Sequence, residues 1–133
     1  MTRKQEREQT FCLIFEKCFR EETCEEILEL AEDVRDFELT EYIKNVFVGI
    51  FQNLETIDDI ISKYLQNWTI DRISKTDLSL LRLAVYEMKF CDDIPESVTV
   101  NEIVELAKAY SGDKGPAYIN GVLGNISRSG ELA

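Results

Sequence analysis

The sequence contains no histidine, and only two prolines and six glycines interrupt its 133 residues. Without histidine, the chain lacks the side chain that most often acts as a general base near neutral pH and that commonly binds metals. Its four cysteines include no C-x-x-C pair, which also argues against a zinc site. We therefore expect no metal, no cofactor and no catalysis, with the cysteines present as mostly buried thiols.

Long apolar runs are also missing. No stretch of 18 apolar residues occurs, and the first segment is rich in charged side chains where a signal peptide would be apolar. The sequence thus predicts no contact with a membrane, and we expect a soluble, cytoplasmic protein. A length of 133 residues with 44% hydrophobic side chains suits one sizeable core, so we expect a single domain over residues 1–133.

Apolar residues recur with the period of a helix along almost the whole chain. Capping boxes, in which threonine is followed three residues later by glutamine or glutamate, predict helix starts at Thr2, Thr23 and Thr99. Pro116 suits the first turn of a last helix. The segment Leu78 to Met88 is apolar around most of its circumference, so we expect it to be the central helix. The sequence predicts an all-α fold of about seven helices.

The first predicted helix begins with cations on the line that should face the core. Positions 3, 7, 11, 14 and 18 share one helix face, and Arg3 and Arg7 precede the apolar residues on it. Because buried arginines need partners, we expect the first two turns to run past the core and to present Arg3, Lys4 and Arg7 to an outside ligand such as a phosphate backbone. Alternatively, the arginine stems lie on apolar surface with their heads in water, and bind no ligand.

Charge is distributed unevenly along the chain, whose formal net charge is -11. Residues 1–20 carry five cations against three acids, whereas residues 21–41 carry ten acids and one arginine, a net -9. Such a field repels polyanions, so we expect weak RNA binding by the isolated protein. The acidic segment suits a basic partner protein, although it can equally be a solvated helix face.

Three further residues are assigned to the fold itself. Arg82 lies in the most apolar helix, and we expect a carboxylate partner such as Glu102 or Glu105. Trp68 is predicted to be a core anchor. Gly121, inside the last helix, is expected to allow close helix packing.

Several segments of the second half, together with the cationic start, resemble the NusB family of transcription antitermination factors. The resemblance lies in the order and spacing of Trp68 with Arg72-Ile73, the segments 81–87, 94–95, 100–102, 105–108 and 118–123, and Arg3, Lys4 and Arg7-Glu8. Residues 20 to 65 match only in helical pattern.

The resemblance implies two packed helical bundles that bind the boxA element of ribosomal RNA leader transcripts. It also implies that the protein pairs with a small-subunit ribosomal protein, NusE, and that the pair keeps RNA polymerase reading through terminators. Contact with the polymerase elongation complex is then indirect. Carried over by position, the RNA-binding residues are Arg3, Lys4, Arg7 and Tyr118, and the residues meeting NusE are Phe15 and Asp77.

Tyr118 follows a glycine-bounded loop that contains Lys114. Single-stranded RNA is bound by aromatic stacking and by cations along its backbone, so we add Lys114 to the predicted RNA site. Tyr118 can also pack against Val122 and Leu123, and the sequence leaves both interpretations open.

Two other functions are consistent with the sequence. One is a protein-binding helical adapter without RNA recognition, which the sparse basic start allows. The other is an enzyme, because NusB-like domains also occur fused to RNA methyltransferases, but the chain has neither a glycine-rich cofactor turn nor a strand pattern.

Overall fold

The computed structural model describes residues 1–35 and 38–133; Asp36 and Phe37, at the end of the predicted acidic helix, lie outside the described residues. Helices joined by loops are the only regular secondary structure among the described residues. They are α1 (Arg3–Lys17), α2 (Cys24–Arg35), α3 (Glu41–Gln52), α4 (Leu54–Tyr64), α5 (Lys75–Phe90), α6 (Glu96–Tyr110) and α7 (Gly115–Ser129).

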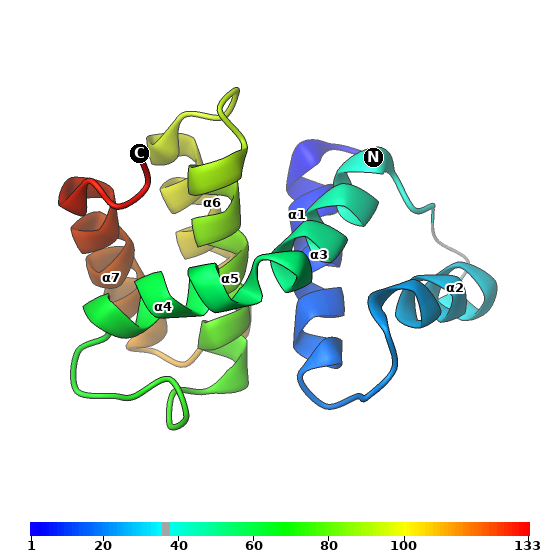
Figure 1. Cartoon of the computed structure of the whole chain (residues 1–133), viewed down its shortest axis with the longest axis horizontal. Coiled ribbons are helices and arrows are strands. Elements are labelled where there is room, and N and C mark those ends of the chain that lie inside the picture. Colours follow the sequence, from blue (N-terminus) through cyan, green and yellow to red (C-terminus); the bar gives the residue numbers. More distant parts are fainter. Residues whose placement is uncertain (36–37) are drawn as a thin grey trace.

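The helices form two groups, as predicted (Figure 1). Helices α1, α2 and α3 pack together in one group, and α4 to α7 form the other. Helix α5 contacts α4, α6 and α7 in its own group and α1 and α3 in the other. Most of its apolar side chains are buried, and Leu80, Leu81, Leu83, Ala84 and Val85 are fully buried. The prediction of a central helix is therefore confirmed.

Two of the predicted capping boxes are present. The Thr2 hydroxyl accepts a hydrogen bond from the Gln5 backbone N–H while the Gln5 side chain accepts one from the Thr2 N–H, and Thr23 and Glu26 form the same pair of bonds. The prediction for Thr99 is wrong. Helix α6 begins at Glu96, with Pro95 as its N-cap residue, so Thr99 lies inside the helix with its hydroxyl directed to a buried carboxylate.

That carboxylate belongs to Glu87 of α5, which is fully buried. Arg7 binds it with two hydrogen bonds, Nε to Oε2 at 2.8 Å and Nη2 to Oε1 at 2.9 Å. Thr99 donates to Oε1 at 2.6 Å, and the Tyr42 hydroxyl donates to Oε2 at 2.5 Å. The four donor and acceptor groups come from α1, α3, α5 and α6, so this network joins the two helix groups.

Burial and hydrogen bonding act on Glu87 in opposite directions. Burial alone would raise the pKa of Glu87, but the hydrogen bonds from Arg7, Thr99 and Tyr42 outweigh it and hold the pKa below its ordinary value. The same surroundings raise the pKa of Tyr42, chiefly through burial and then through the adjacent carboxylate. Glu87 is therefore a charged carboxylate at neutral pH, satisfied by its donors.

The three fold assignments made from the sequence are wrong in detail. Arg82 pairs with Asp58 of α4, at 3.0 and 2.9 Å, because its side chain faces α4 rather than α6. Trp68 is 56% exposed and does not anchor the core. Gly121 is exposed, and a Cβ there would meet no atom within 4 Å, whereas at Gly49 a Cβ would lie 2.3 to 2.7 Å from the ring and hydroxyl of Tyr86. The close helix approach is thus at Gly49, between α3 and α5.

The four cysteines are half-buried rather than mostly buried, and none forms a disulfide. Among the helices of residues 1–35 and 38–133, none has the length and apolar character needed to cross a bilayer. No group of three potential metal-binding side chains occurs within the same residues.

Replacing Gly49 by alanine should destabilise the fold, because the new methyl group forces the Tyr86 ring to move. Overpacking of this kind costs about 1–3 kcal/mol. Gly121→Ala is the matched control and should stabilise the protein by up to about 1 kcal/mol, since alanine favours an exposed helix position. Urea denaturation of both variants measures the difference. Equal effects of the two substitutions would contradict the packing described for Gly49.

Glu87→Gln should destabilise the protein strongly at pH 7, because the amide NH2 that replaces one carboxylate oxygen faces an N–H of Arg7 and the hydroxyl of either Thr99 or Tyr42, and because Arg7 loses its counter-ion. The expected loss is about 3–5 kcal/mol. Glu105→Gln on the surface of α6 is the control and should change stability little.

The same comparison has a predicted pH dependence. The pKa of Glu87 is lowered in the folded state from about 4.5, so its contribution is present above that value and is lost as pH falls through the folded-state pKa. The stability difference between wild type and Glu87→Gln should therefore shrink below about pH 4.5. A difference that stays constant down to pH 2 would contradict the network.

Candidate functional site

The start of α1 presents two cations to solvent. Lys4 is exposed, and the Arg3 side chain is 47% exposed, with Nε 3.3 Å from Glu6 Oε1 and the guanidinium 4.3 Å from the centre of the Tyr42 ring. These are surface contacts that an incoming phosphate can share or replace. Arg3 and Lys4 therefore lie where the sequence predicted them.

Arg7 does not. It is 5% exposed, and its guanidinium is bound on two nitrogens by the Glu87 carboxylate. The expectation that the second turn of α1 runs past the core and presents Arg7 to an outside ligand is wrong, because the carboxylate partner lies on α5 inside the protein. Arg7 holds the first turns of α1 against the core and so positions Arg3 and Lys4.

The second predicted part of the site lies at the start of α7. A cavity of about 480 Å³ opens there between the loop after α4 and the first turns of α5 and α7. Asp77, Lys114 and Tyr118 line it, together with Trp68 and Arg72, which the sequence analysis did not assign to a site. Lys114 and Tyr118 are therefore neighbours in space, as predicted.

Tyr118 combines the two interpretations left open by its sequence. Its ring is partly buried, and its hydroxyl donates to the Gln66 carbonyl at 2.8 Å and accepts from the Gln66 N–H at 3.1 Å. Burial raises the pKa of Tyr118, so its hydroxyl stays protonated at neutral pH. Tyr118 ties the loop after α4 to α7, and its ring forms part of the cavity wall.

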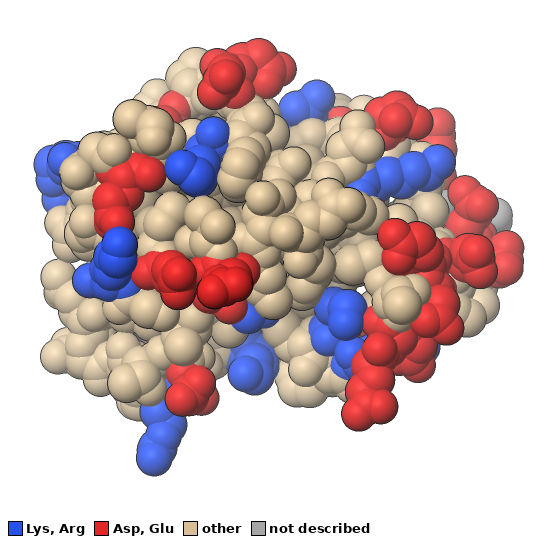
Figure 2. Space-filling view, viewed as in Figure 1, with Lys and Arg blue, Asp and Glu red and all other residues tan. Residues whose placement is uncertain are grey.

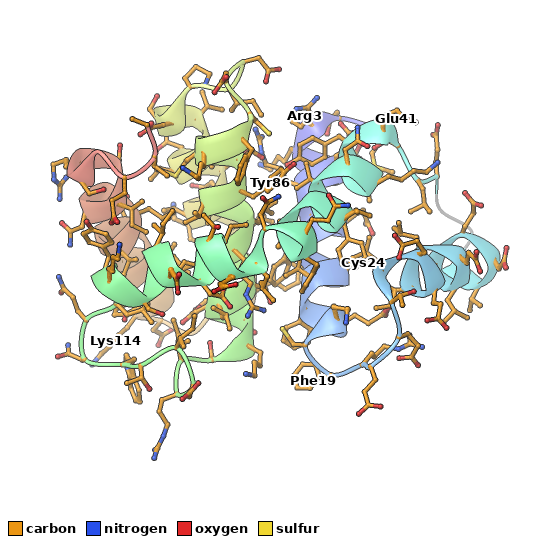
Figure 3. All side chains as sticks on the ribbon, in the orientation of Figure 1. Arg3, Phe19, Cys24, Glu41, Tyr86 and Lys114 are labelled. Atoms are coloured by element: carbon orange, nitrogen blue, oxygen red, sulfur yellow. The ribbon has the colours of Figure 1, made fainter. Side chains whose placement is uncertain are left out.

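The two cationic regions are separate. Figure 3 shows Arg3 at one end of α1 and Lys114 on the opposite side of the molecule. An RNA strand that touches both regions must therefore cross the surface between them.

That intervening surface is continuous but acidic. A cavity of about 210 Å³ between α1 and α6 is lined by three carboxylates, Glu8, Glu102 and Glu105, together with Lys4 and with Arg7, whose charge is already paired with Glu87. At its far end the Tyr110 hydroxyl donates to Glu8 Oε2 at 2.8 Å, a bond that, with burial, raises the pKa of Tyr110 to about 12. Tyr110 in turn lines a shallow cavity that also includes Asp77 and Lys114. Lys4 and Lys114 lie at the two ends of this path, and Lys108 beside it is paired with Glu105.

Phe15 and Asp77, the predicted partner-binding residues, lie on adjoining surfaces. Phe15 lines a small, mostly apolar cavity of about 190 Å³ with Phe11, Thr76 and Tyr110. Thr76 and Tyr110 also line the shallow cavity that contains Asp77. Asp77 itself accepts a hydrogen bond from Ser111 at 2.6 Å. It also lines the Lys114 cavity, so it lies between that cavity and the surface around Phe15.

The surface around Phe15 is formed by more aromatic residues than the sequence analysis proposed, and we call Phe11, Phe15, Phe19 and Tyr110 the aromatic surface. Phe11 and Phe15 of α1 and Phe19, just after its end, follow each other at i, i+4 spacing, with ring centres 6.4 and 5.1 Å apart, and Phe19 is 64% exposed. Tyr110 of α6 packs on Phe11 at 4.9 Å. The i, i+4 repeat was visible in the sequence and could have indicated this surface.

Negative charge gathers on α2. The side chains of α2 include five exposed acids, Glu25, Glu26, Glu29, Glu32 and Asp33. Figure 2 shows this acidic surface over α2, at the end of the molecule away from α7. The protein therefore repels a phosphate more strongly near α2 than near α7.

Comparison with known proteins identifies the family of the chain. The NusB family model matches residues 4–128. The chain is 45% identical, over 140 residues, to the transcription antitermination protein NusB of Clostridium botulinum (strain Loch Maree / Type A3), which covers 95% of this chain and 99% of that protein.

Solved structures give the same result. NusB of T. maritima matches with a TM-score of 0.87 and 36% identity, covering 97% of this chain and 92% of that chain. A chain from the crystal structure of antitermination factors NusB and NusE in complex with double-stranded RNA matches with a TM-score of 0.80 and 29% identity, covering 95% and 97%. On its sequence and its fold, the chain belongs to the NusB family.

Proposed function

We propose that the protein is a transcription antitermination factor that binds boxA-type single-stranded RNA of ribosomal RNA leader transcripts. In this proposal it acts together with the small-subunit ribosomal protein NusE and promotes read-through by RNA polymerase, which it contacts only indirectly. The observation that carries the proposal is family membership over nearly the full chain, including likeness to a structure that contains NusB, NusE and RNA.

The surface chemistry supports RNA binding at the two ends of the α1–α6 path. Arg3 and Lys4 supply cations at one end, and Lys114 with the Tyr118 ring supplies a cation and an aromatic wall at the other. Single strands bind through this combination of charge and stacking. The carboxylates between the two ends repel phosphate, so binding by the isolated protein should be weak.

The partner protein would occupy the aromatic surface next to the Lys114 cavity. Exposed aromatic side chains beside a small apolar cavity are the kind of anchor that dominates protein interfaces. Phe15 is half-buried and lines that cavity, so it would act as such an anchor, and Asp77 would lie where the protein and RNA surfaces meet. The net charge of -11 also favours association with a basic ribosomal protein.

We infer no catalytic role, because the relatives named here are antitermination proteins. Since antitermination acts on transcribing RNA polymerase, we expect the protein in the cytoplasm. The burial of Arg7 favours one alternative, an adapter that binds the partner protein without RNA, because it leaves fewer cations at the start of α1.

RNA binding should show a small electrostatic component. Three exposed cations, Arg3, Lys4 and Lys114, predict a slope of about -2 for log affinity against log salt on a single strand. The double variant Arg3→Gln/Lys4→Gln should weaken binding about tenfold or more at 0.1 M salt and make the slope less negative by about 1.4. Fluorescence anisotropy of a labelled boxA-type oligonucleotide, titrated with and without NusE, measures both quantities.

Arg128→Gln at the other end of α7 is the matched control and should leave affinity and slope unchanged. Tighter binding in the presence of NusE is expected from linkage between the two partners. If the double variant binds boxA RNA as wild type does, the cationic start of α1 is not part of the RNA site. If wild type with NusE binds no RNA, the adapter function replaces the proposed one.

A further inference from the structure

The cavity at the start of α7 contains an exposed tryptophan. Trp68 is 56% exposed, although tryptophan buries more apolar area than any other side chain when it enters a core. It lines the 480 Å³ cavity together with Tyr118, so that two aromatic residues from distant parts of the chain border one space. Cavities of several hundred Å³ are the size that small ligands occupy.

The loop that carries Trp68 is held in place by hydrogen bonds. The Tyr118 hydroxyl bonds both the carbonyl and the N–H of Gln66. Asn67 follows in the left-handed region at φ 67°, which asparagine tolerates better than most residues. Two further bonds, from the Arg72 and Ile73 N–H groups to the Thr69 carbonyl, close the turn beyond Trp68. Trp68 is therefore exposed on an ordered loop.

Two cations border the same cavity. Arg72 and Lys114 both line it and are both exposed, and the side chain of neither forms an ion pair with any residue in the described part of the chain. Arg72 can contact a phosphate with two N–H groups, and Lys114 acts as a point charge. Aromatic rings, here those of Trp68 and Tyr118, next to unpaired cations form a combination that binds a nucleotide, with the base stacked and the phosphate neutralised.

We propose that this cavity binds one unstacked nucleotide of the RNA strand, with its base on the Trp68 ring and its phosphate on Arg72 and Lys114. The proposal rests on the RNA-binding function proposed above and assigns to it two residues, Trp68 and Arg72. Asp77 also lines the cavity, with one carboxylate oxygen bound by Ser111. Its charge disfavours phosphate on that side, so the backbone of the nucleotide runs past the cations.

Trp68 is the only tryptophan in the chain, so its fluorescence reports directly on this cavity. A boxA-type single-stranded RNA added to the wild-type protein without NusE should quench the fluorescence in proportion to the RNA bound. Trp68→Ala should weaken RNA binding about tenfold, the usual effect of losing one stacked base. Trp68→Phe retains an aromatic face and should keep most of the affinity. Arg72 adds a fourth phosphate contact to the three counted above, so the wild-type slope becomes about -2.8, and Arg72→Gln should weaken binding and return the slope to about -2.

Phe90→Ala, at an exposed aromatic residue near the end of α5, is the matched control and should bind RNA as wild type does. Circular dichroism melting verifies that each variant is folded. If wild type and Trp68→Ala bind RNA equally and the fluorescence does not change, the inference is wrong while RNA binding itself stands. If Trp68→Ala weakens NusE binding but not RNA binding, the cavity belongs to the protein interface and the inference is also wrong.

Discussion

The buried carboxylate of Glu87 is the constraint on which the arrangement of the helices depends. A fully buried charge is tolerated only when donors surround it, and here the donors come from Arg7 on α1, Tyr42 on α3 and Thr99 on α6. Glu87 itself lies on the central helix α5. The network can form only when both helix groups are packed on α5, so it ties the relative position of the groups to a few hydrogen bonds.

This network also decides which cations are available at the surface. Because Arg7 points inward to Glu87, the start of α1 offers only Arg3 and Lys4 to a phosphate backbone. The field of the acidic α2 helix and the carboxylates between α1 and α6 oppose any polyanion. RNA recognition on such a surface has to rely on aromatic side chains, on a few well-placed cations and on a partner protein. The cavity formed by Trp68, Tyr118, Arg72 and Lys114 has this composition.

Much of the fold could be predicted from the sequence, because helix periods and capping boxes are local signals. The Thr2 and Thr23 caps and the buried central helix are read from residues a few positions apart. The pairing of Arg7 with Glu87 spans 80 positions and leaves no local trace. An arginine on an apolar helix face has the same pattern whether its partner is an internal carboxylate or an external phosphate.

The candidate site was predictable to a similar extent. Arg3, Lys4 and Lys114 are exposed, and Tyr118 lines a cavity with Lys114, while the contact of these residues with RNA stays a prediction. The sequence predicts Trp68 in the core because large aromatic residues are usually buried, but it lies exposed on a loop that the hydrogen bonds between Tyr118 and Gln66 tie to α7. The partner of Arg82 was misassigned for a similar reason, since helix orientation decides which carboxylate an arginine meets.

The most direct test of the central claim is nuclear magnetic resonance of the arginine side chains while boxA-type RNA is added. If Arg7 belongs to the internal network, its Nε–H should exchange slowly with solvent in the free protein and should not shift on RNA binding. The Nε–H signals of Arg3 and Arg72 should shift in the same titration. A shift of the Arg7 signal as large as that of Arg3, with loss of its protection from exchange, would contradict the account.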